Sequence, residues 1–134
     1  MPDPAGRLAL IVEDNPDNML LMKAVLRRAG YRTEEARTAR EVEERLQASL
    51  PDVILMDIQL PGEDGLTLTR RLRADARTAE VPIVALTAYA MADDQVRAQD
   101  AGCDGYITKP IDTRNFAGQL AAILGRLHSK AGAP

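Results

Sequence analysis

The feature that most constrains this chain is a short apolar run, residues 53–56, that ends on an acidic residue, Asp57. Pro51 and Pro61 stand on either side of it. A run this short and continuously apolar is typical of a strand buried on both faces, as in a parallel sheet. A carboxylate in such a place is costly unless water, a metal or a cation satisfies it. We therefore predict that Asp57 lies at the carboxyl edge of a central strand, where open α/β sheets place their chemistry.

Length and composition limit the number of domains and the classes of function that this chain can have. With 134 residues the chain has the size of one domain and can bury roughly two-thirds of its unfolded surface. A net charge of -3 argues against a dedicated nucleic-acid surface, which needs a basic excess. The single cysteine, Cys103, excludes an internal disulfide and fits a reducing compartment. No apolar run approaches the roughly 20 residues of a membrane span, and the N-terminus lacks a signal peptide's apolar centre, so we expect a cytoplasmic protein.

Five predicted strands alternate with five predicted helices along the chain. The strands are expected at residues 8–12, 31–36, 53–57, 82–87 and 105–108, and the helices at residues 16–28, 38–50, 66–75, 91–101 and about 113–127. There are no repeats, linkers or low-complexity blocks. The alternation predicts the α/β class, with a parallel sheet covered by helices on both faces.

Side-chain patterns orient the predicted helices. The apolar stripe of the second helix includes Leu50. The fourth helix has the poorest stripe, in which only Ala92 and Val96 are expected to face the core, so it should be held least firmly. The third helix is expected to present a solvated basic face made of Arg70, Arg71 and Arg73.

Residues that carry chemistry follow four of the predicted strands. They are Glu13 and Asp14 after the first, Asp57 after the third, Thr87 after the fourth and Lys109 after the fifth. Three carboxylates close together repel unless a cation neutralises them, and all-oxygen ligation suits Mg²⁺. A carboxylate can attack phosphorus to give an aspartyl-phosphate, while a lysine and a hydroxyl supply charge and a hydrogen bond to the transferring group. This set of residues predicts reversible self-phosphorylation.

Four ordered motifs make the sequence resemble the receiver domain of two-component response regulators. They are Ile11-Val12-Glu13-Asp14-Asn15, Leu55-Met56-Asp57-Ile58-Gln59-Leu60-Pro61, Ala85-Leu86-Thr87-Ala88 and Tyr106-Ile107-Thr108-Lys109-Pro110. The resemblance spans about residues 8–127 and looks most like stand-alone receivers of the DivK type or the receivers of hybrid kinases. Together the motifs are highly specific, although any one alone would be weak.

The resemblance implies a flavodoxin-like, doubly wound five-stranded parallel sheet in the strand order 2-1-3-4-5. The receiver domain is expected over residues 7–128, with flexible termini at residues 1–6 and 129–134. The first methionine and the short tail favour a whole, stand-alone chain.

The resemblance also implies roles for the site residues. Asp57 is the implied phosphoacceptor, and Lys109, joined to the following proline by a cis bond, contacts the phosphoryl group. Mg²⁺ is the implied cofactor. Its ligands would be Asp14, Asp57 and the backbone carbonyl of Gln59, with Glu13 reaching the metal mainly through water.

The same resemblance implies a conformational switch and two residues that control how long the phosphate persists. Thr87 would turn towards the phosphate and Tyr106 would swing into the vacated space, changing the surface made by the helix 91–101, the strand 105–108 and the last helix. Gln59 and Tyr89 lie two positions after Asp57 and Thr87, beside the approach of a hydrolytic water. Gln59 could orient that water and Tyr89 could exclude it, and we expect shielding by Tyr89 to be the stronger effect.

These roles predict a phosphorylation-activated signalling switch that catalyses its own phosphorylation and slow dephosphorylation, rather than a turnover enzyme. The expected partners are a histidine kinase or histidine phosphotransfer protein and a downstream protein, without direct nucleic-acid binding or membrane insertion. A phosphorylation-dependent dimer is left open.

The alternative is a Mg²⁺-dependent phosphatase that uses Asp57 as a turnover nucleophile. Phosphatases of the haloacid dehalogenase type place a second acid two residues after the nucleophile, where this chain has Gln59. A nucleotide-binding domain is disfavoured because neither GxGxxG nor a P-loop follows the first strand. A degenerate scaffold is disfavoured because every residue of the acidic pocket is present.

Overall fold

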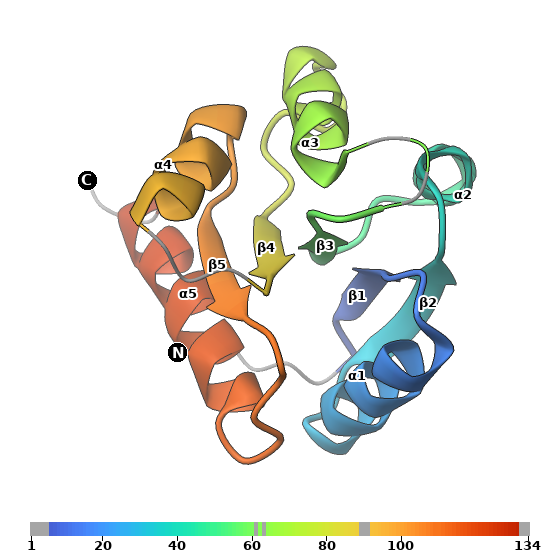
Figure 1. Cartoon of the computed structure of the whole chain (residues 1–134), viewed down its shortest axis with the longest axis vertical. Coiled ribbons are helices and arrows are strands. Elements are labelled where there is room, and N and C mark those ends of the chain that lie inside the picture. Colours follow the sequence, from blue (N-terminus) through green and yellow to red (C-terminus); the bar gives the residue numbers. More distant parts are fainter. Residues whose placement is uncertain (1–5, 61, 63, 89–91, 132–134) are drawn as a thin grey trace.

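The backbone forms one parallel sheet of five strands with five helices packed on it, in the residues that a computed structural model describes, 6–60, 62, 64–88 and 92–131 (Figure 1). The strands are β1 (Leu8–Val12), β2 (Arg32–Ala36), β3 (Val53–Asp57), β4 (Ile83–Thr87) and β5 (Gly105–Thr108). The helices are α1 (Pro16–Arg28), α2 (Ala39–Ala48), α3 (Gly65–Ala74), α4 (Ala92–Ala101) and α5 (Phe116–Ala131). The strand order β2-β1-β3-β4-β5 confirms the predicted order.

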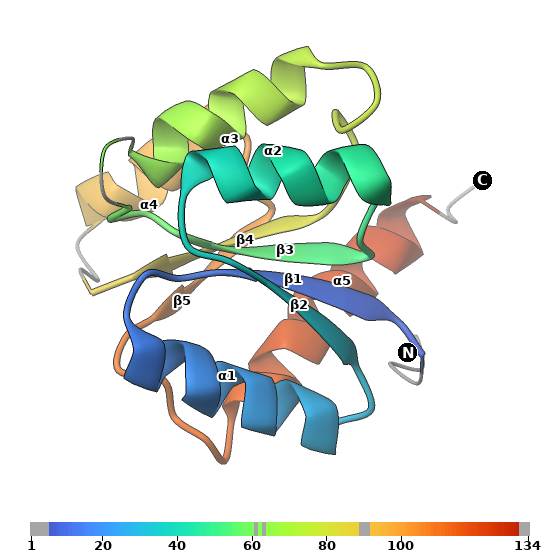
Figure 2. The same cartoon turned by 90° about the vertical axis from the view of Figure 1, so that its right-hand side faces the viewer.

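The helices lie in two layers, with α1 and α5 on one face of the sheet and α2, α3 and α4 on the other (Figure 2). The central strand β3 is buried along its whole length, as its continuous apolar run predicts. Ile54 and Met56 belong to the core under α2, α3 and α4, whereas Val53 and Leu55 belong to the core under α1 and α5. Because successive side chains of β3 point to opposite layers, this strand anchors both.

The turn from β1 into α1 is fixed by a helix cap. Asn15 Oδ1 accepts the backbone N–H groups of Asp17, at 2.9 Å, and Asn18, at 3.1 Å, and Pro16 occupies the first helical position. This cap places the acidic residues that follow β1 in a short, defined turn at the carboxyl edge of the sheet.

Arg73 departs from the predicted solvated basic face of α3. Its guanidinium donates to the carbonyl oxygens of Val81, at 2.6 Å, and Gly102, at 2.8 Å, and pairs with the Asp104 carboxylate at 2.8 Å. Asp104 in turn accepts the N–H of Ile83 at 2.9 Å. Carbonyl groups in the connections to β4 and β5 need donors, and a guanidinium supplies five, so Arg73 is held against the protein. The two other arginines of α3 are exposed, as predicted.

Helix α4 packs on the core through different residues from those predicted. Val96 is 52% exposed, so its predicted inward orientation is wrong. The buried positions are Ala98 and Ala101, whose small side chains let α4 approach the core closely. The side chain of Ala92 lies outside the described residues. Helix α4 therefore buries only small side chains among its described positions, which agrees with its expected weak anchoring.

Two helices, α2 and α5, differ from their predicted bounds by two residues or more, and α5 begins at Phe116 instead of about residue 113. Helix α2 ends at Ala48, and Ser49 has an extended backbone, so Leu50 leaves the helical stripe and is 42% exposed. Helix α5 continues to Ala131, because its last turn contains no proline and no capping glycine within the described range. The predicted flexible termini fall mostly on residues 1–5 and 132–134, which lie outside the described residues. Among the described helices, none has the length and apolar character needed to cross a membrane.

Candidate functional site

The predicted site residues converge at the carboxyl edge of the sheet. The Lys109 ammonium lies 2.7 Å from Glu13 Oε1 and 3.1 Å from Asp57 Oδ2. Glu13 and Asp57 are almost fully buried, at 1% and 3% exposure, whereas Asp14 is exposed. One carboxylate oxygen from each of the three acids lies within 4.8 Å of the others. Among the described residues, those that follow β1 and β5 and the last residue of β3 therefore form one acidic cluster around the half-buried Lys109 ammonium.

Backbone hydrogen bonds beyond the strands hold this cluster in place. The N–H of Lys109 donates to the Thr87 carbonyl at 2.7 Å, and the N–H of Glu13 donates to the Ala36 carbonyl at 3.0 Å. The peptide bond from Lys109 to the following proline is cis, as predicted. Since each site residue continues the ladder of a neighbouring strand, its position is set by the sheet and not by a free loop.

Burial controls the protonation of the cluster. Burial, followed by the neighbouring Glu13, raises the pKa of Asp57 to about 6, although the Gln59 N–H, 2.9 Å from Oδ1, and Lys109 oppose this rise. Burial also acts to raise the pKa of Glu13, but the neighbouring Lys109 ammonium and Asp57 carboxyl group hold it below its usual value. Burial favours neutral Lys109, yet the two carboxylates raise its pKa, so it stays protonated.

The cluster suits a small divalent cation. Glu13 Oε1 is buried and, among the described residues, accepts no hydrogen bond of regular geometry, although the Lys109 ammonium lies close to it. One ammonium cannot neutralise three carboxylates, and Asp14 is exposed at the open side of the cluster. Carboxylate oxygens, with water completing the shell, are the ligands that Mg²⁺ prefers. The donor set therefore fits the predicted metal.

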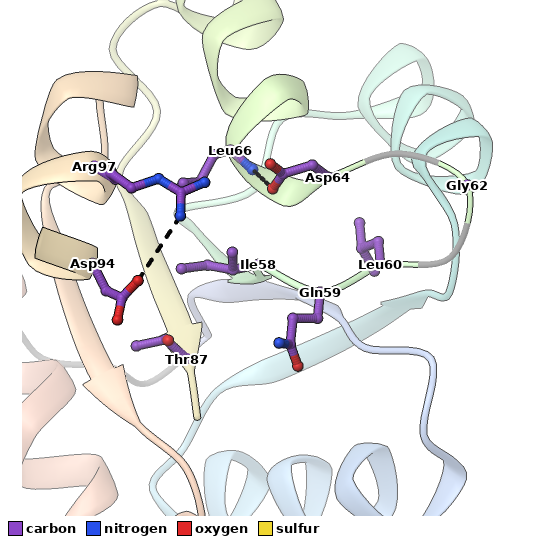
Figure 3. Close-up of a pocket in the computed structure, with 9 residues that line it drawn as sticks. All are labelled: Ile58, Gln59, Leu60, Gly62, Asp64, Leu66, Thr87, Asp94 and Arg97. Carbon is purple, nitrogen blue, oxygen red and sulfur yellow. Dashed lines mark hydrogen bonds and ion pairs between the residues drawn. The ribbon is translucent and has the colours of Figure 1, made fainter. Parts of the chain in front are cut away.

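A cavity of about 470 Å³ opens beside the cluster, between α4 and the segment that joins β3 to α3 (Figure 3). The Ile58 side chain points into it, Thr87 borders it, and Arg97 reaches over it from α4 (Figure 3). Arg97 lies 3.9 Å from Asp94 of the same helix. The sequence did not predict that Ile58 and Arg97 line a cavity. The order of residues in α4 does not indicate that this helix faces the segment that joins β3 to α3. Thr87 thus borders a cavity next to the acidic cluster.

For the other predicted site residues, the structure gives a position without testing the predicted role. Tyr106 is 38% exposed on β5, opposite Ala85 of β4 in the strand register, whereas Thr87 is buried at the end of β4. The Gln59 side chain is exposed. It lies on the opposite side of the cavity from Arg97 and points away from that residue (Figure 3). Tyr89 lies outside the described residues. The roles of these side chains stay predictions.

The comparison with known families decides the classification. A family model described as "Response regulator receiver domain" matches residues 9–121. The chain belongs to this family. Its members are signalling receivers of two-component systems rather than classical enzymes, and the predicted recognition and fold class are confirmed.

Individual receiver proteins agree with this assignment. The polar-differentiation response regulator DivK of Brucella ovis is 40% identical over 116 residues, which cover 87% of this chain and 94% of that protein. The receiver domain of a sensor histidine kinase from Pseudomonas aeruginosa, described with a magnesium ion in its active site cleft, is 36% identical. Its TM-score is 0.80, and the match covers 90% of this chain and 99% of that one. The receiver of a histidine kinase from Syntrophus aciditrophicus is 33% identical with a TM-score of 0.81, over 91% and 92% of the two chains.

The raised pKa of Asp57 predicts a pH-dependent effect of Asp57→Asn on stability. An acid whose pKa rises on folding contributes stability below its unfolded pKa, and this contribution is lost as the pH rises through about 6. In metal-free buffer at about pH 8, Asp57→Asn should raise the free energy of unfolding by about 1 kcal/mol, a gain that should disappear near pH 4. Urea unfolding across this pH range measures the effect.

The matched control is Asp100→Asn, which removes an exposed carboxylate on α4. Its effect on stability should be small at every pH. A gain from Asp57→Asn that stays constant between about pH 4 and 8 would show that the buried charge is not the cause.

Proposed function

We propose that this receiver is a phosphorylation-driven switch that accepts a phosphoryl group on Asp57 from a phospho-histidine donor. The observation that supports it best is the half-buried ammonium of Lys109, 2.7 Å from Glu13 and 3.1 Å from Asp57. A carboxylate nucleophile and a fixed positive charge stand side by side at the open edge of a rigid sheet. This pairing is what phosphoryl transfer needs from a protein, because its catalysis consists mainly of positioning and charge stabilisation.

Asp57 is the best nucleophile of the three acids. Its higher pKa makes its carboxylate more basic than that of Glu13, whose pKa is lowered. The Gln59 N–H holds Oδ1 at 2.9 Å, which fixes the orientation of the carboxylate. Asp14 is exposed, and it would serve the metal instead.

The transfer forms one bond and breaks one. The Asp57 oxygen forms a new bond to phosphorus while the phosphorus–nitrogen bond of the donor breaks, and the electron pair of that bond stays on the imidazole nitrogen. Lys109 then pairs with the phosphoryl oxygens, and the Thr87 hydroxyl donates to one of them. Bound Mg²⁺, held by Asp14, Asp57 and the Gln59 carbonyl with Glu13 acting through water, would supply the remaining positive charge. The receiver would in this way catalyse its own phosphorylation.

The output would be a change in the surface made by α4, β5 and α5. Tyr106 borders a hollow of about 280 Å³ that Ala98 and Gln99 of α4 and Arg126 of α5 also line, so its ring has room to move. Thr87 borders the cavity beneath α4. A Thr87 hydroxyl drawn towards the phosphate would leave space for Tyr106, and weakly anchored α4 would follow.

The partners follow from this chemistry. A histidine kinase or histidine phosphotransfer protein would donate the phosphoryl group in the cytoplasm, and a downstream protein would bind the changed surface. The lifetime of the phosphate would depend on Gln59, which could orient a water, and on Tyr89, which could exclude it. The receiver would then lose its phosphate slowly and by its own chemistry.

Labelling tests the assignment of Asp57. With Mg²⁺ and acetyl phosphate or a phospho-histidine donor, the parent should take up about one phosphoryl group per chain, and Asp57→Asn should take up none. Asp64→Asn is the matched control, because Asp64 caps α3 next to the site and asparagine caps a helix equally well. It should be labelled like the parent.

Three outcomes would count against the proposal. Stoichiometric labelling of Asp57→Asn at one other residue would refute the phosphoacceptor. Undiminished labelling in excess EDTA would exclude the metal. Continuous release of phosphate from small phosphomonoesters would instead favour the phosphatase alternative.

Replacing Thr87 tests the switch. Thr87→Ala should leave phosphorylation of Asp57 largely intact but remove most of the phosphorylation-dependent change in hydrogen exchange across α4 and β5, because the hydroxyl that senses the phosphate is gone. Thr87→Ser keeps the hydroxyl and should behave like the parent. Exchange that changes on phosphorylation only around residues 39–48 would contradict the proposed output surface.

A further inference from the structure

Gly65, the first residue of α3, lies directly on the backbone of the phosphoacceptor. It is buried, and its N–H donates to the Ile58 carbonyl at 2.9 Å. A Cβ atom built on Gly65 would lie 2.2 Å from the Asp57 carbonyl oxygen and 2.9 Å from the Ile58 Cα. Helix α3 therefore begins in contact with the peptide that joins Asp57 to Ile58, closer than any residue with a side chain would allow.

Space, and not backbone conformation, explains the glycine. Gly65 does not have the positive φ angle that Gly62 and Gly102 have, so an L residue could adopt its backbone. The atoms that exclude a methyl group belong to the backbone of Asp57 and Ile58, and they cannot rotate away as the end of a side chain can. The close contact that a glycine permits therefore explains the residue.

The peptide that joins Asp57 to Ile58 is connected to the acidic cluster on both sides. The N–H of Ile58 donates to the Leu86 carbonyl of β4 at 3.1 Å, and Asp57 Oδ1 accepts the Gln59 N–H at 2.9 Å. The other oxygen of Asp57 lies 3.1 Å from Lys109. A shift of this peptide would move the Asp57 carboxylate and the Gln59 backbone together, relative to Lys109 and the rest of the sheet edge.

We propose that Gly65 is a positioning residue for phosphoryl transfer: it lets the first turn of α3 press on the peptide between Asp57 and Ile58 and so hold the Asp57 carboxylate against Lys109. The proposal rests on the function proposed above. An ordinary carbon contact needs at least 3.4 Å, so a methyl group would force α3 and the Asp57 carbonyl apart by about 1 Å. Misplacement of a reacting group by about 1 Å can reduce a rate roughly 100-fold.

The test compares Gly65→Ala with two matched glycine variants. Gly105→Ala also creates a tight contact, with Ile123 side-chain atoms at 2.9 to 3.1 Å, but away from the acidic cluster. Gly118→Ala, in α5, meets no atom within 4 Å. At saturating Mg²⁺, Gly65→Ala should be labelled by acetyl phosphate roughly 100-fold more slowly than the parent, whereas both other variants should stay within about threefold. Urea unfolding of the three variants separates this loss from a loss of stability.

A second form of the test measures Gly65→Ala in a stabilised variant, so that slow labelling cannot result from simple unfolding. Gly118→Ala combined with Gly125→Ala adds two alanines to α5 at positions with open space, each worth up to about 1 kcal/mol. Gly65→Ala should fold in this background and remain slow. Labelling at the parent rate, or a loss that Gly105→Ala shares at equal stability, would overturn the proposal. A Gly65→Ala protein that does not fold even there would make Gly65 a determinant of folding and would also overturn it.

A Mg²⁺ titration followed by amide NMR separates this proposal from the proposed function. If the parent takes no label, the proposed function fails, and the titration still tests the geometry. Gly65→Ala should bind Mg²⁺ at least about tenfold more weakly than Gly105→Ala, because its displaced peptide leads to the Gln59 carbonyl. Equal Mg²⁺ affinities of these two variants would overturn the positioning role of Gly65.

Discussion

A single ammonium group, that of Lys109, stands between the buried carboxylates of Glu13 and Asp57. Two carboxylates this deeply buried cannot both stay ionised without a counter-charge, because burial penalises each charge and each repels the other. Lys109 supplies one positive charge, yet burial, followed by the neighbouring Glu13, still raises the pKa of Asp57. The cluster is therefore a site of incomplete neutralisation, which a proton or a divalent cation can complete. The chemistry that we propose uses this imbalance.

The sheet makes the arrangement rigid. Lys109 reaches the cluster because its own N–H continues the ladder to β4, and Glu13 is held in the same way against β2. From the other side, Gly65 lets α3 rest on the peptide that follows Asp57. The region around α4 is built differently, since α4 packs with small side chains and leaves a cavity beneath it. A rigid acidic cluster next to a helix that buries only small side chains would suit the proposed switch, because a local change of charge can bias the element that is easiest to move.

The acidic cluster could be predicted from the sequence because parallel strands bring their carboxyl ends to one edge, whatever the details of packing. Positions that depend on packing could not be predicted. Arg73 follows the periodicity of a solvated face, and only the folded connections around it supply the carbonyl groups that hold it. Val96 is the larger apolar residue of α4, yet the small Ala98 is buried because close approach of the helix favours it. The close contact between Gly65 and the Asp57 backbone exists only once α3 and β3 are in place.

The most direct test of this account is the titration of the Asp57 carboxyl group, followed by the ¹³C chemical shift of its side chain. In metal-free buffer it should titrate with a pKa of about 6. Added Mg²⁺ should lower this pKa, because the cation and the proton compete for the same oxygens. A metal-free pKa below about 4, the ordinary range of an aspartate, would contradict the account, and so would a pKa that Mg²⁺ leaves unchanged.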